Sequence, residues 1–356
     1  MVQLNEMRAV PAHEDSAQLR SPTESRAAVT RADVRGDIEQ YRSFHDNAGG
    51  NLEARRDRYA DMVRGYYDLV TDIYERGWGD SFHFAPRYRG EAFEASLKRH
   101  QHYIALRLGL TTGMTALDIG CGVGGPMREI ARISGTRVYG VNNNSYQVSK
   151  ARTYNQEARL TALCELLEAD FMNIPRADGS VDAAYAFEAT CHAPDKTALF
   201  RELYRVLKPG GKLAIYEWCL TSSYDARVAT HAQVKRDIEE GNGLPDIWTI
   251  DATRACFEQA GFQVLGEEDR AGQGDAELPW YHSLTGRELS NTGIRRSPVG
   301  KAMVKVLTRT LEAARVAPRG TSRIADFLNR GADALVRGGE LGIFTPMAFF
   351  LAQKPL

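Results

Sequence analysis

The nine residues Leu117-Asp118-Ile119-Gly120-Cys121-Gly122-Val123-Gly124-Gly125 join an apolar segment, 116–119, to a helix that Pro126 opens. Glycines at such a junction allow a tight turn and let the backbone approach a ligand closely. Proline is favoured in the first turn of a helix, where its missing N–H is not needed. The segment therefore predicts the first strand-turn-helix unit of a sheet whose ligand lies at the carboxyl ends of the strands.

Strands and helices alternate after this glycine turn. Apolar runs predict strands over 137–141, 162–168, 181–187, 212–217, 263–265 and 343–352. Periodic segments predict helices over 145–159, capped by Ser145, over 196–207, and over 252–260, capped by Asp251. Alternation of this kind is typical of a mostly parallel sheet covered by helices on both faces.

Segments of a different character flank this alternating core. Residues 1–45 lack apolar periodicity and predict a mobile tail. Residues 46–110 predict an aromatic amphipathic helix over 53–78 and a second helix over 91–108. We expect 111–267 to form the ligand-binding core and 268–356 to add helices over 297–315 and 321–336 before the last strand. The basic amphipathic part of the first, 299–315, fits either packing on its own domain or resting on a membrane.

The overall composition excludes several classes of protein. The 356 residues carry 45 Lys and Arg against 46 Asp and Glu, a formal net charge of −1, which argues against a basic nucleic-acid-binding surface. There is no run of about 18 apolar residues and no secretory signal. Five scattered cysteines without a C-x-x-C pair indicate neither disulfides nor a thiolate metal site. We expect a cytoplasmic protein without a transmembrane segment, and leave peripheral membrane contact and homo-oligomerisation open.

Two kinds of nucleotide compete as the ligand of the glycine turn. Gly120, Gly122 and Gly125 satisfy the G-x-G-x-x-G pattern of dinucleotide-dependent oxidoreductases. That pattern requires a ribose-binding acid about 20 residues later, but Asn142-Asn143-Asn144 stands there. Asp118 would repel a pyrophosphate, whereas it suits the ammonium group of an amino acid. The order D-x-G-x-G resembles the first motif of Rossmann-like S-adenosylmethionine (SAM) methyltransferases.

Further motifs resemble one family, the sterol 24-C-methyltransferases. In chain order they are YYDLVTDIYE (66–75), GWGDSFHF (77–84), GCGVGGP (120–126), NNNSYQ (142–147), EATCHAP (188–194), YEW (216–218) and FTPM (344–347). The resemblance runs from about Tyr41 to the C-terminus. It implies an α/β, Rossmann-like class I SAM methyltransferase fold: a mostly parallel seven-stranded sheet whose last strand is antiparallel, N-terminal helices, and a helical insertion before that strand.

The resemblance also implies a reaction in sterol biosynthesis. A methyl group would pass from SAM to C24 of a Δ24 sterol through a carbocation, a hydride shift and a deprotonation, without a metal. An alkene is a weak nucleophile, so orientation and exclusion of water are the main contributions expected of the enzyme. C-methylation of another triterpene or isoprenoid lipid would use nearly the same motifs and stays an alternative, with a dinucleotide-dependent oxidoreductase as a distant one. For a eukaryotic member the family implies the endoplasmic reticulum.

Roles for individual residues follow from the same resemblance. The implied cofactor-binding residues are Tyr67, His83, Asp118, Gly120, Cys121, Gly122, Asn142, Asn143, Gln147, Asp170 and Phe171. The implied bases or cation stabilisers are Glu188, His192, Tyr74, Glu75 and Glu217, and the implied substrate-binding residues are Tyr66, Asp72, Trp78, Phe82 and Phe84. Structural roles stay open as alternatives for several of these: core packing for Tyr66 and Tyr74, a turn for Asp170, and satisfied structural histidines at 83 and 192.

Overall fold

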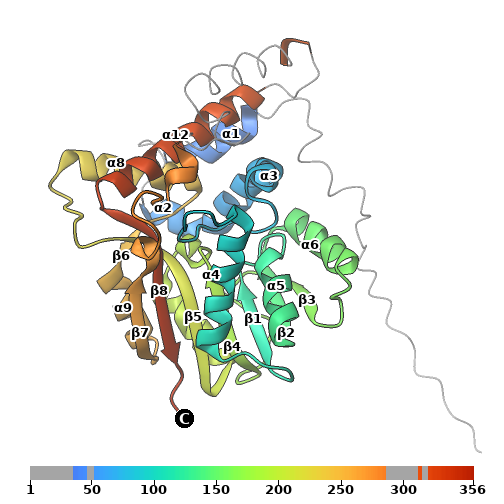
Figure 1. Cartoon of the computed structure of the whole chain (residues 1–356). Coiled ribbons are helices and arrows are strands. Elements are labelled where there is room, and N and C mark those ends of the chain that lie inside the picture. Colours follow the sequence, from blue (N-terminus) through green and yellow to red (C-terminus); the bar gives the residue numbers. More distant parts are fainter. Residues whose placement is uncertain (1–34, 46–51, 286–311, 315–319) are drawn as a thin grey trace, which may run out of the picture.

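A mixed β-sheet organises the computed structural model, which describes residues 35–45, 52–285, 312–314 and 320–356 (Figure 1). Its strands are β1 Thr115–Ile119, β2 Arg137–Asn142, β3 Cys164–Glu168, β4 Val181–Phe187, β5 Leu207–Leu220, β7 Gln263–Asp269 and β8 Phe344–Gln353, in the order β3-β2-β1-β4-β5-β8-β7. Strands β1 to β5 pair in parallel, and β8 runs antiparallel to both β5 and β7. The predicted sheet is confirmed, with one addition: the two-residue strand β6, Trp248–Thr249, pairs with the end of β5.

Helices cover both faces of this sheet. On one face α4 (Phe93–Leu108) and α5 (Gly125–Ser134) pack their apolar sides, including Ile104 and Met127, against the central strands. On the other face α7 (Lys196–Val206) and α9 (Ile250–Gln259) pack against the sheet through Phe200 and Phe257. Helix α6 (Ser145–Glu157) contacts β2 and β3. The central strands are apolar at successive positions because both of their faces are buried.

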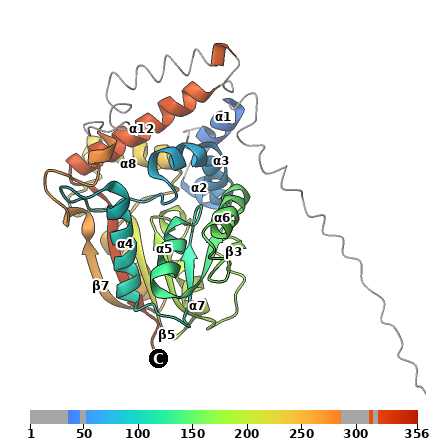
Figure 2. The ribbon, with the colours of Figure 1, turned by 45° about the vertical axis from the view of Figure 1, so that its right-hand side comes forward.

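A second group of helices lies over the carboxyl edge of the parallel strands (Figures 1 and 2). These are α1 Arg35–Ser43, α2 Leu52–Asp57, α3 Tyr59–Trp78, α8 Ala229–Asn242 and α12 Thr321–Glu340. Helix α12 packs along α8, and α1 contacts both α3 and α12. The N-terminal helices and the insertion before the last strand thus meet above the edge where the glycine turn lies.

Helix α1 shows that the predicted tail boundary at residue 45 is wrong. Tyr41 is buried against Phe327 of α12, with ring centroids 5.3 Å apart, and donates a hydrogen bond to the carbonyl of Glu240. The helix is short and strongly polar, so its buried apolar residues, Ile38 and Tyr41, together with Phe44 just after its end, give little periodic signal. Residues 1–34 of the predicted tail lie outside the described residues.

Several predicted helix ends differ in the structure. The helix expected over 53–78 is divided at Arg58 into α2 and α3. Asn144, not Ser145, caps α6 by accepting from the backbone N–H of Gln147, and Thr249, not Asp251, caps α9. Helix α8 was not predicted from the sequence. Most of the helix predicted over 297–315 lies outside the described residues.

Helices α8 and α12 approach most closely at two glycines. A Cβ atom on Gly241 would lie 2.4 Å from Cα of Gly331, so backbone would have to move. We expect Gly241→Ala to lower the free energy of unfolding by about 1–3 kcal/mol. Gly65→Ala in α3 is the control, because its Cβ would meet nothing within 4 Å; there alanine is expected to stabilise by about 0.5–1 kcal/mol. Chemical denaturation measures both, and equal effects of the two substitutions would contradict the close approach.

Candidate active site

A cavity opens at the carboxyl ends of β1, β2 and β4, beside the glycine turn. Its walls are Tyr59, Val63, Tyr67, Asp80, Phe82, His83, Asp118, Gly120, Cys121, Gly122, Val123, Pro126, Asn142, Asn143, Gln147, Phe171, Phe187, Glu188, Ala189 and His192. We call this the glycine-turn cavity. It brings together ten of the eleven residues predicted to bind the cofactor; the exception, Asp170, is not part of the described wall.

The glycine turn presents backbone rather than side chains to this cavity. Gly120 has φ +69°, and a Cβ atom there would lie 2.4 Å from Cβ of Ala189. The N–H groups of Gly120 and Cys121 both donate to the carbonyl of Val141, at 2.9 and 3.2 Å, which ties the turn to the end of β2. A larger residue at position 120 would close the space in which a ligand approaches the backbone.

Asp118 places an unpaired carboxylate in the cavity wall. Its side chain is 2% exposed, and its Oδ2 has no hydrogen bond of good geometry among the described residues, although the Tyr185 hydroxyl lies close enough to interact with it. Burial raises the pKa of Asp118 to about 8, and Tyr185 only partly offsets this. A buried carboxylate without a donor is costly unless a ligand supplies one, so the wall fits the ammonium group of the methionine part of SAM.

Asn142, Asn143 and Gln147 build an uncharged polar wall, while the side chain of Asn144 caps α6. Asn142 donates to Oε1 of Gln147 at 2.9 Å and to the carbonyl of Gly122 at 3.2 Å, while its Oδ1 accepts from the N–H of Asn144. Gln147 donates in turn to the hydroxyl of Thr71 at 3.0 Å. Amides both donate and accept, so this wall fits the hydroxyl groups of a ribose without needing an acid.

Asp170 acts on the cavity through a neighbour. Its Oδ1 accepts from the backbone N–H of Met172 at 2.8 Å, as in a turn, and also from the hydroxyl of Tyr59. Tyr59 stacks on Phe171, with ring centroids 6.2 Å apart, and both rings line the cavity. The turn interpretation of Asp170 is therefore correct, and its carboxylate also fixes an aromatic wall.

A second cavity lies next to the first and is mostly aromatic and aliphatic. Its walls are Ile73, Tyr74, Gly77, Trp78, Phe82, His83, Phe84, Glu188, Trp218, Gly241, Asn242, Leu284, Leu328, Asn329, Ala332 and Leu335. We call this the aromatic cavity; it holds about 880 Å³ of space including its mouth. Phe82, His83 and Glu188 belong to both cavities, so the two spaces meet at these residues.

Glu188 occupies this junction in a strained conformation. It follows β4 with φ +54°, which is rare for a residue with a long side chain and is common at functional sites. Its Oε1 accepts from the N–H of Phe84 at 2.6 Å and its Oε2 from Nε1 of Trp218 at 2.8 Å. Burial raises the pKa of Glu188 to about 8, because these two hydrogen bonds only partly compensate for the lost water.

Both predicted histidines are neutral and fully hydrogen-bonded. Nδ1 of His192 donates to the carbonyl of Gly243 at 2.9 Å, so its Nε2 accepts from the Tyr67 hydroxyl at 3.0 Å. His83 likewise donates from Nδ1 to the carbonyl of Phe84 and accepts at Nε2 from Gln101. Burial lowers the pKa of each histidine to about 4. They are satisfied structural histidines that also line the cavities.

Two predicted acids of α3 face helix α6 instead of the cavities. Asp72 accepts from Tyr146 at 2.6 Å and from Lys150 at 2.8 Å, and Glu75 accepts from Lys150 and, at 2.7 Å, from Tyr154. Although partial burial opposes it, these hydrogen bonds lower the pKa of Asp72. Neither acid belongs to a described cavity wall. Both instead connect α3 to α6 through hydrogen bonds and ion pairs.

Glu217 and Tyr66 also lie behind the cavity walls. Glu217 is completely buried and accepts from Lys196 at 3.0 Å and from Thr190 at 2.6 Å, which fixes the turn that carries His192. Its other oxygen accepts from the backbone N–H of Trp218. Tyr66 bonds the Tyr74 hydroxyl and packs in the apolar core, whereas Tyr74 reaches the aromatic cavity.

Some wall residues were not assigned from the sequence. Tyr59 lies on the apolar stripe of α3, Trp218 stands inside the YEW motif, and four residues of α12, Leu328, Asn329, Ala332 and Leu335, close the aromatic cavity. Position on the apolar stripe of a helix predicts burial but does not distinguish a core residue from a cavity wall.

Among the described residues no group of three or more His, Cys, Asp or Glu is arranged to hold a metal ion. No helix of the described ranges is long and apolar enough to cross a membrane.

Comparison with known proteins assigns the family. A methyltransferase domain matches residues 117–215, and a sterol methyltransferase C-terminal region matches 291–356. Cycloartenol-C-24-methyltransferase of Arabidopsis thaliana is 47% identical over 92% of this chain and 97% of its own length. The chain belongs to the sterol 24-C-methyltransferase family. A sterol 24-C-methyltransferase of Saccharomyces cerevisiae is 42% identical, over 89% of this chain and 85% of its own. Both family and SAM-dependent activity, as predicted from the sequence, are thereby confirmed.

Solved structures agree on the fold of this sterol 24-C-methyltransferase family member. The cyclopropane synthase MmaA2 from Mycobacterium tuberculosis aligns with a TM-score of 0.65 at 16% identity, over 83% of this chain and 98% of its own. A geranyl diphosphate C-methyltransferase from Streptomyces coelicolor, solved with S-adenosyl-L-homocysteine, gives 0.62 at 15% identity over the same shares. The class I methyltransferase fold is therefore confirmed, and the dinucleotide oxidoreductase is excluded by the family.

Proposed function

We propose that this chain methylates C24 of a Δ24 sterol, with SAM in the glycine-turn cavity and the sterol side chain in the aromatic cavity. The observation that carries the proposal is the junction: the two cavities share Phe82, His83 and Glu188. A methyl donor in one space and an alkene in the other would face each other there. Apolar walls around the alkene would keep water from the cationic intermediate.

The residues of the glycine-turn cavity divide the work of holding SAM. SAM, when bound, supplies an electrophilic methyl group. The Asp118 carboxylate binds the ammonium group, Asn142, Asn143 and Gln147 bind the ribose, and the Tyr59–Phe171 pair, fixed by Asp170, holds the adenine. The Tyr67 hydroxyl donates a hydrogen bond to Nε2 of His192. The oxygen of Tyr67 can therefore accept a hydrogen bond from a ligand in the cavity.

The aromatic cavity handles the positive charge that forms on the sterol. Tyr74, Trp78, Phe82 and Phe84 offer ring faces, which stabilise a desolvated cation by about 2 kcal/mol. Glu188, in its ionised form, contributes a negative charge at the junction and is the group to which we assign removal of the final proton. The C–H bond that breaks leaves its electron pair in the new alkene, and the proton passes to the carboxylate.

Tyr74 gives a test of the aromatic wall. We expect Tyr74→Leu, which removes the ring face, to lower kcat about 10- to 30-fold through lost cation stabilisation. Tyr74→Phe keeps the face and loses only the hydroxyl that bonds Tyr66, so its rate should stay within about threefold of the parent chain. Steady-state kinetics with product analysis compares the two. Equal losses in both variants would assign the effect to the hydroxyl and the core.

The substrate is tested with the purified full chain. Labelled SAM is incubated with a panel of Δ24 sterols and, in parallel, with open-chain isoprenoid lipids, and products are identified by mass spectrometry. We expect label at C24 of a sterol. Label only in another triterpene or isoprenoid would replace the sterol by that lipid class, since the same two cavities serve either substrate.

The lipophilic substrate also bears on where the protein works. We propose a cytoplasmic enzyme that contacts a membrane surface peripherally, at the endoplasmic reticulum in a eukaryotic cell, because a sterol partitions into the bilayer. Co-sedimentation with sterol-containing vesicles tests this, and full recovery of the protein in the supernatant would contradict it.

A further inference from the structure

Six residues between α3 and α4 cover both cavities. We call residues 79–84 the covering loop: its Asp80, Phe82 and His83 line the glycine-turn cavity, and Phe82, His83 and Phe84 line the aromatic cavity. At its far end the loop is held by Glu188, which accepts from the N–H of Phe84. In its middle, Gln101 of α4 bonds Ser81 and His83 at 3.2 and 2.9 Å.

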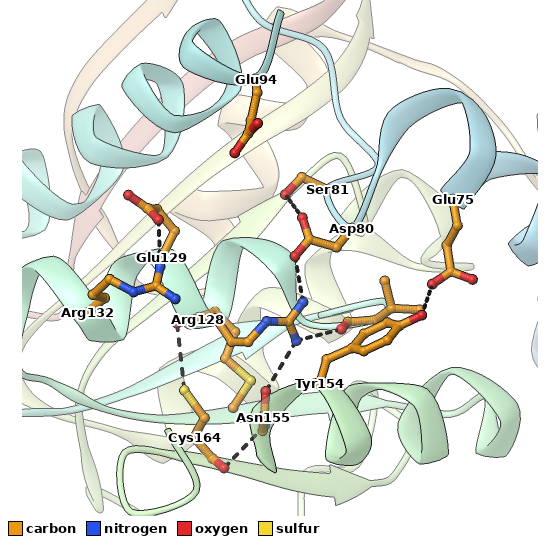
Figure 3. Close-up of polar contacts among 12 residues, drawn as sticks. Glu75, Asp80, Ser81, Glu94, Arg128, Glu129, Arg132, Tyr154, Asn155 and Cys164 are labelled. Carbon is orange, nitrogen blue, oxygen red and sulfur yellow. Dashed lines mark hydrogen bonds and ion pairs between the residues drawn. The ribbon is translucent and has the colours of Figure 1, made fainter. Parts of the chain in front are cut away.

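The near end of the covering loop is held by Arg128 of α5. Its guanidinium donates to Oδ2 of Asp80 at 2.7 Å and to the carbonyl of Val123, inside the glycine turn, at 2.8 Å (Figure 3). A third hydrogen bond goes to Oδ1 of Asn155 at 3.2 Å, and the group lies 5.4 Å above the ring of Tyr154. One guanidinium therefore joins the cofactor turn to the loop over the substrate.

Backbone atoms of the glycine turn and the covering loop are also in direct contact. The N–H of Gly125 donates to the carbonyl of Asp80 at 3.1 Å, and a Cβ atom on Gly125 would lie 2.2 Å from that oxygen. Movement of the turn when a ligand enters would therefore act on Asp80 twice, through backbone contact and through Arg128. Arg128 itself is not part of either described cavity wall, so any effect of its loss on the reaction must pass through other residues.

We propose that Arg128 is a positioning residue that couples cofactor binding at the glycine turn to the placement of the covering loop over the substrate. The inference rests on the proposed function for the identity of the two ligands. The planar guanidinium suits this task because it donates in several fixed directions at once, whereas an ammonium is a single point charge. Binding of the cofactor fixes Val123, Arg128 transmits this to Asp80, and Phe82, His83 and Phe84 are thereby held in the walls.

Asp80, the partner of Arg128 in the ion pair, can be changed to separate a coupling role from a merely structural one. Arg128 is buried, but the side chain of Asp80 is 55% exposed, and without the Asp80 charge Arg128 keeps its hydrogen bonds to the Val123 carbonyl and to Asn155. Asp80→Asn should therefore leave the fold intact while freeing the loop. Under the coupling role the loop responds to cofactor in the parent chain and no longer does so in the variant.

Hydrogen exchange with S-adenosylhomocysteine measures this response directly. In the parent chain we expect saturating S-adenosylhomocysteine to slow amide exchange in 79–84; in Asp80→Asn and in Arg128→Lys we expect at least half of that protection to be lost. With sterol, kcat/KM should fall at least about tenfold, mainly through KM. Asp178→Asn is the matched control: it removes another exposed carboxylate bonded to an arginine, Arg205, at 2.6 Å, and should change neither readout.

The outcomes separate the inference from the proposed function. Full protection of 79–84 in both variants, with parental kcat/KM, would overturn the coupling role. An effect of Asp80→Asn that Arg128→Lys does not share would also overturn it, because Asp80 lines the cavity and would then act by direct contact. If the parent chain methylates no sterol, the proposed function fails, yet ligand-dependent protection of the loop still tests the coupling. The double variant should lose no more than either single one, as expected for one shared interaction.

Discussion

Asp118→Asn is expected to weaken SAM binding about 30- to 100-fold while making the ligand-free protein more stable. The unpaired carboxylate in the cavity wall has no internal donor of good geometry for Oδ2 among the described residues. The ammonium group of SAM would supply that donor, and charge-assisted hydrogen bonds of this kind contribute about 2–3 kcal/mol. Asparagine keeps the shape and loses the charge. Isothermal titration calorimetry measures the affinity, and an unchanged dissociation constant would move the ammonium site away from Asp118.

The stability effect of Asp118→Asn has a definite pH dependence. Burial raises the pKa of Asp118 to about 8, so between about pH 4 and 8 the folded chain holds a proton that the unfolded chain has released. The contribution of Asp118 to stability therefore falls as pH rises through this window and stays low above it. We expect the free energy of unfolding of Asp118→Asn to exceed that of the parent chain by about 1–3 kcal/mol near pH 8. Near pH 4 the two proteins should be about equally stable. Denaturation at the two pH values checks this.

Asp182→Asn is the matched control on the neighbouring strand. Asp182 is the second residue of β4, at the amino ends of the parallel strands, where it accepts from the N–H of Thr115 at 2.9 Å and from Lys208 at 2.6 Å. Partial burial opposes these bonds, but together they lower the pKa of Asp182. Loss of this carboxylate should reduce stability at pH values above the pKa that Asp182 has in the unfolded chain, and it should leave SAM affinity unchanged. Asp118→Asn is expected to do the opposite in both measurements.

The walls of the glycine-turn cavity could be predicted almost completely from the sequence. Residues at the ends of neighbouring parallel strands meet at one edge of the sheet, so the order of motifs along the chain already brings Asp118, Asn142 and Phe171 together. The glycine turn needs no side-chain information, since its function depends on backbone approach. The mostly parallel sheet with its antiparallel last strand followed from the same family pattern, whereas the order of the strands was not predicted.

The substrate side could not be predicted in the same way. Asp72 and Glu75 stand in an aromatic motif, but Lys150, Tyr146 and Tyr154, which bind them, come from a helix 70 or more residues away in the sequence. Whether a carboxylate faces a cavity or a lysine depends on this packing, and residue type carries no signal of it. Helix α12 closes the aromatic cavity for the same reason: its apolar stripe predicts burial, and only the fold assigns that burial to a cavity wall.

Glu188→Gln is expected to lower kcat by about 100-fold or more, with SAM affinity within about threefold of the parent chain. The change removes the charge at the junction and keeps the size of the side chain. Both carboxylate oxygens accept hydrogen bonds, from the N–H of Phe84 and from Nε1 of Trp218, so the amide nitrogen of glutamine would face a donor on one side. Glu267→Gln is the control: burial also raises the pKa of Glu267, but it lines neither described cavity and should leave kcat unchanged.

The pH profile distinguishes the charge of Glu188 from its shape. Burial raises the pKa of Glu188 to about 8, so below pH 8 the junction is mostly neutral, and kcat/KM of the parent chain should rise about tenfold per pH unit up to about pH 8 and then level off. Trp218→Phe removes one hydrogen bond that lowers this pKa, so its profile should shift to higher pH with the same plateau form. With SAM saturating, so that protonation of Asp118 no longer limits cofactor binding, the profile of Glu188→Gln should be flat over the same range. A rising limb that persists in the glutamine variant would assign the titration to another group and remove Glu188 as the base.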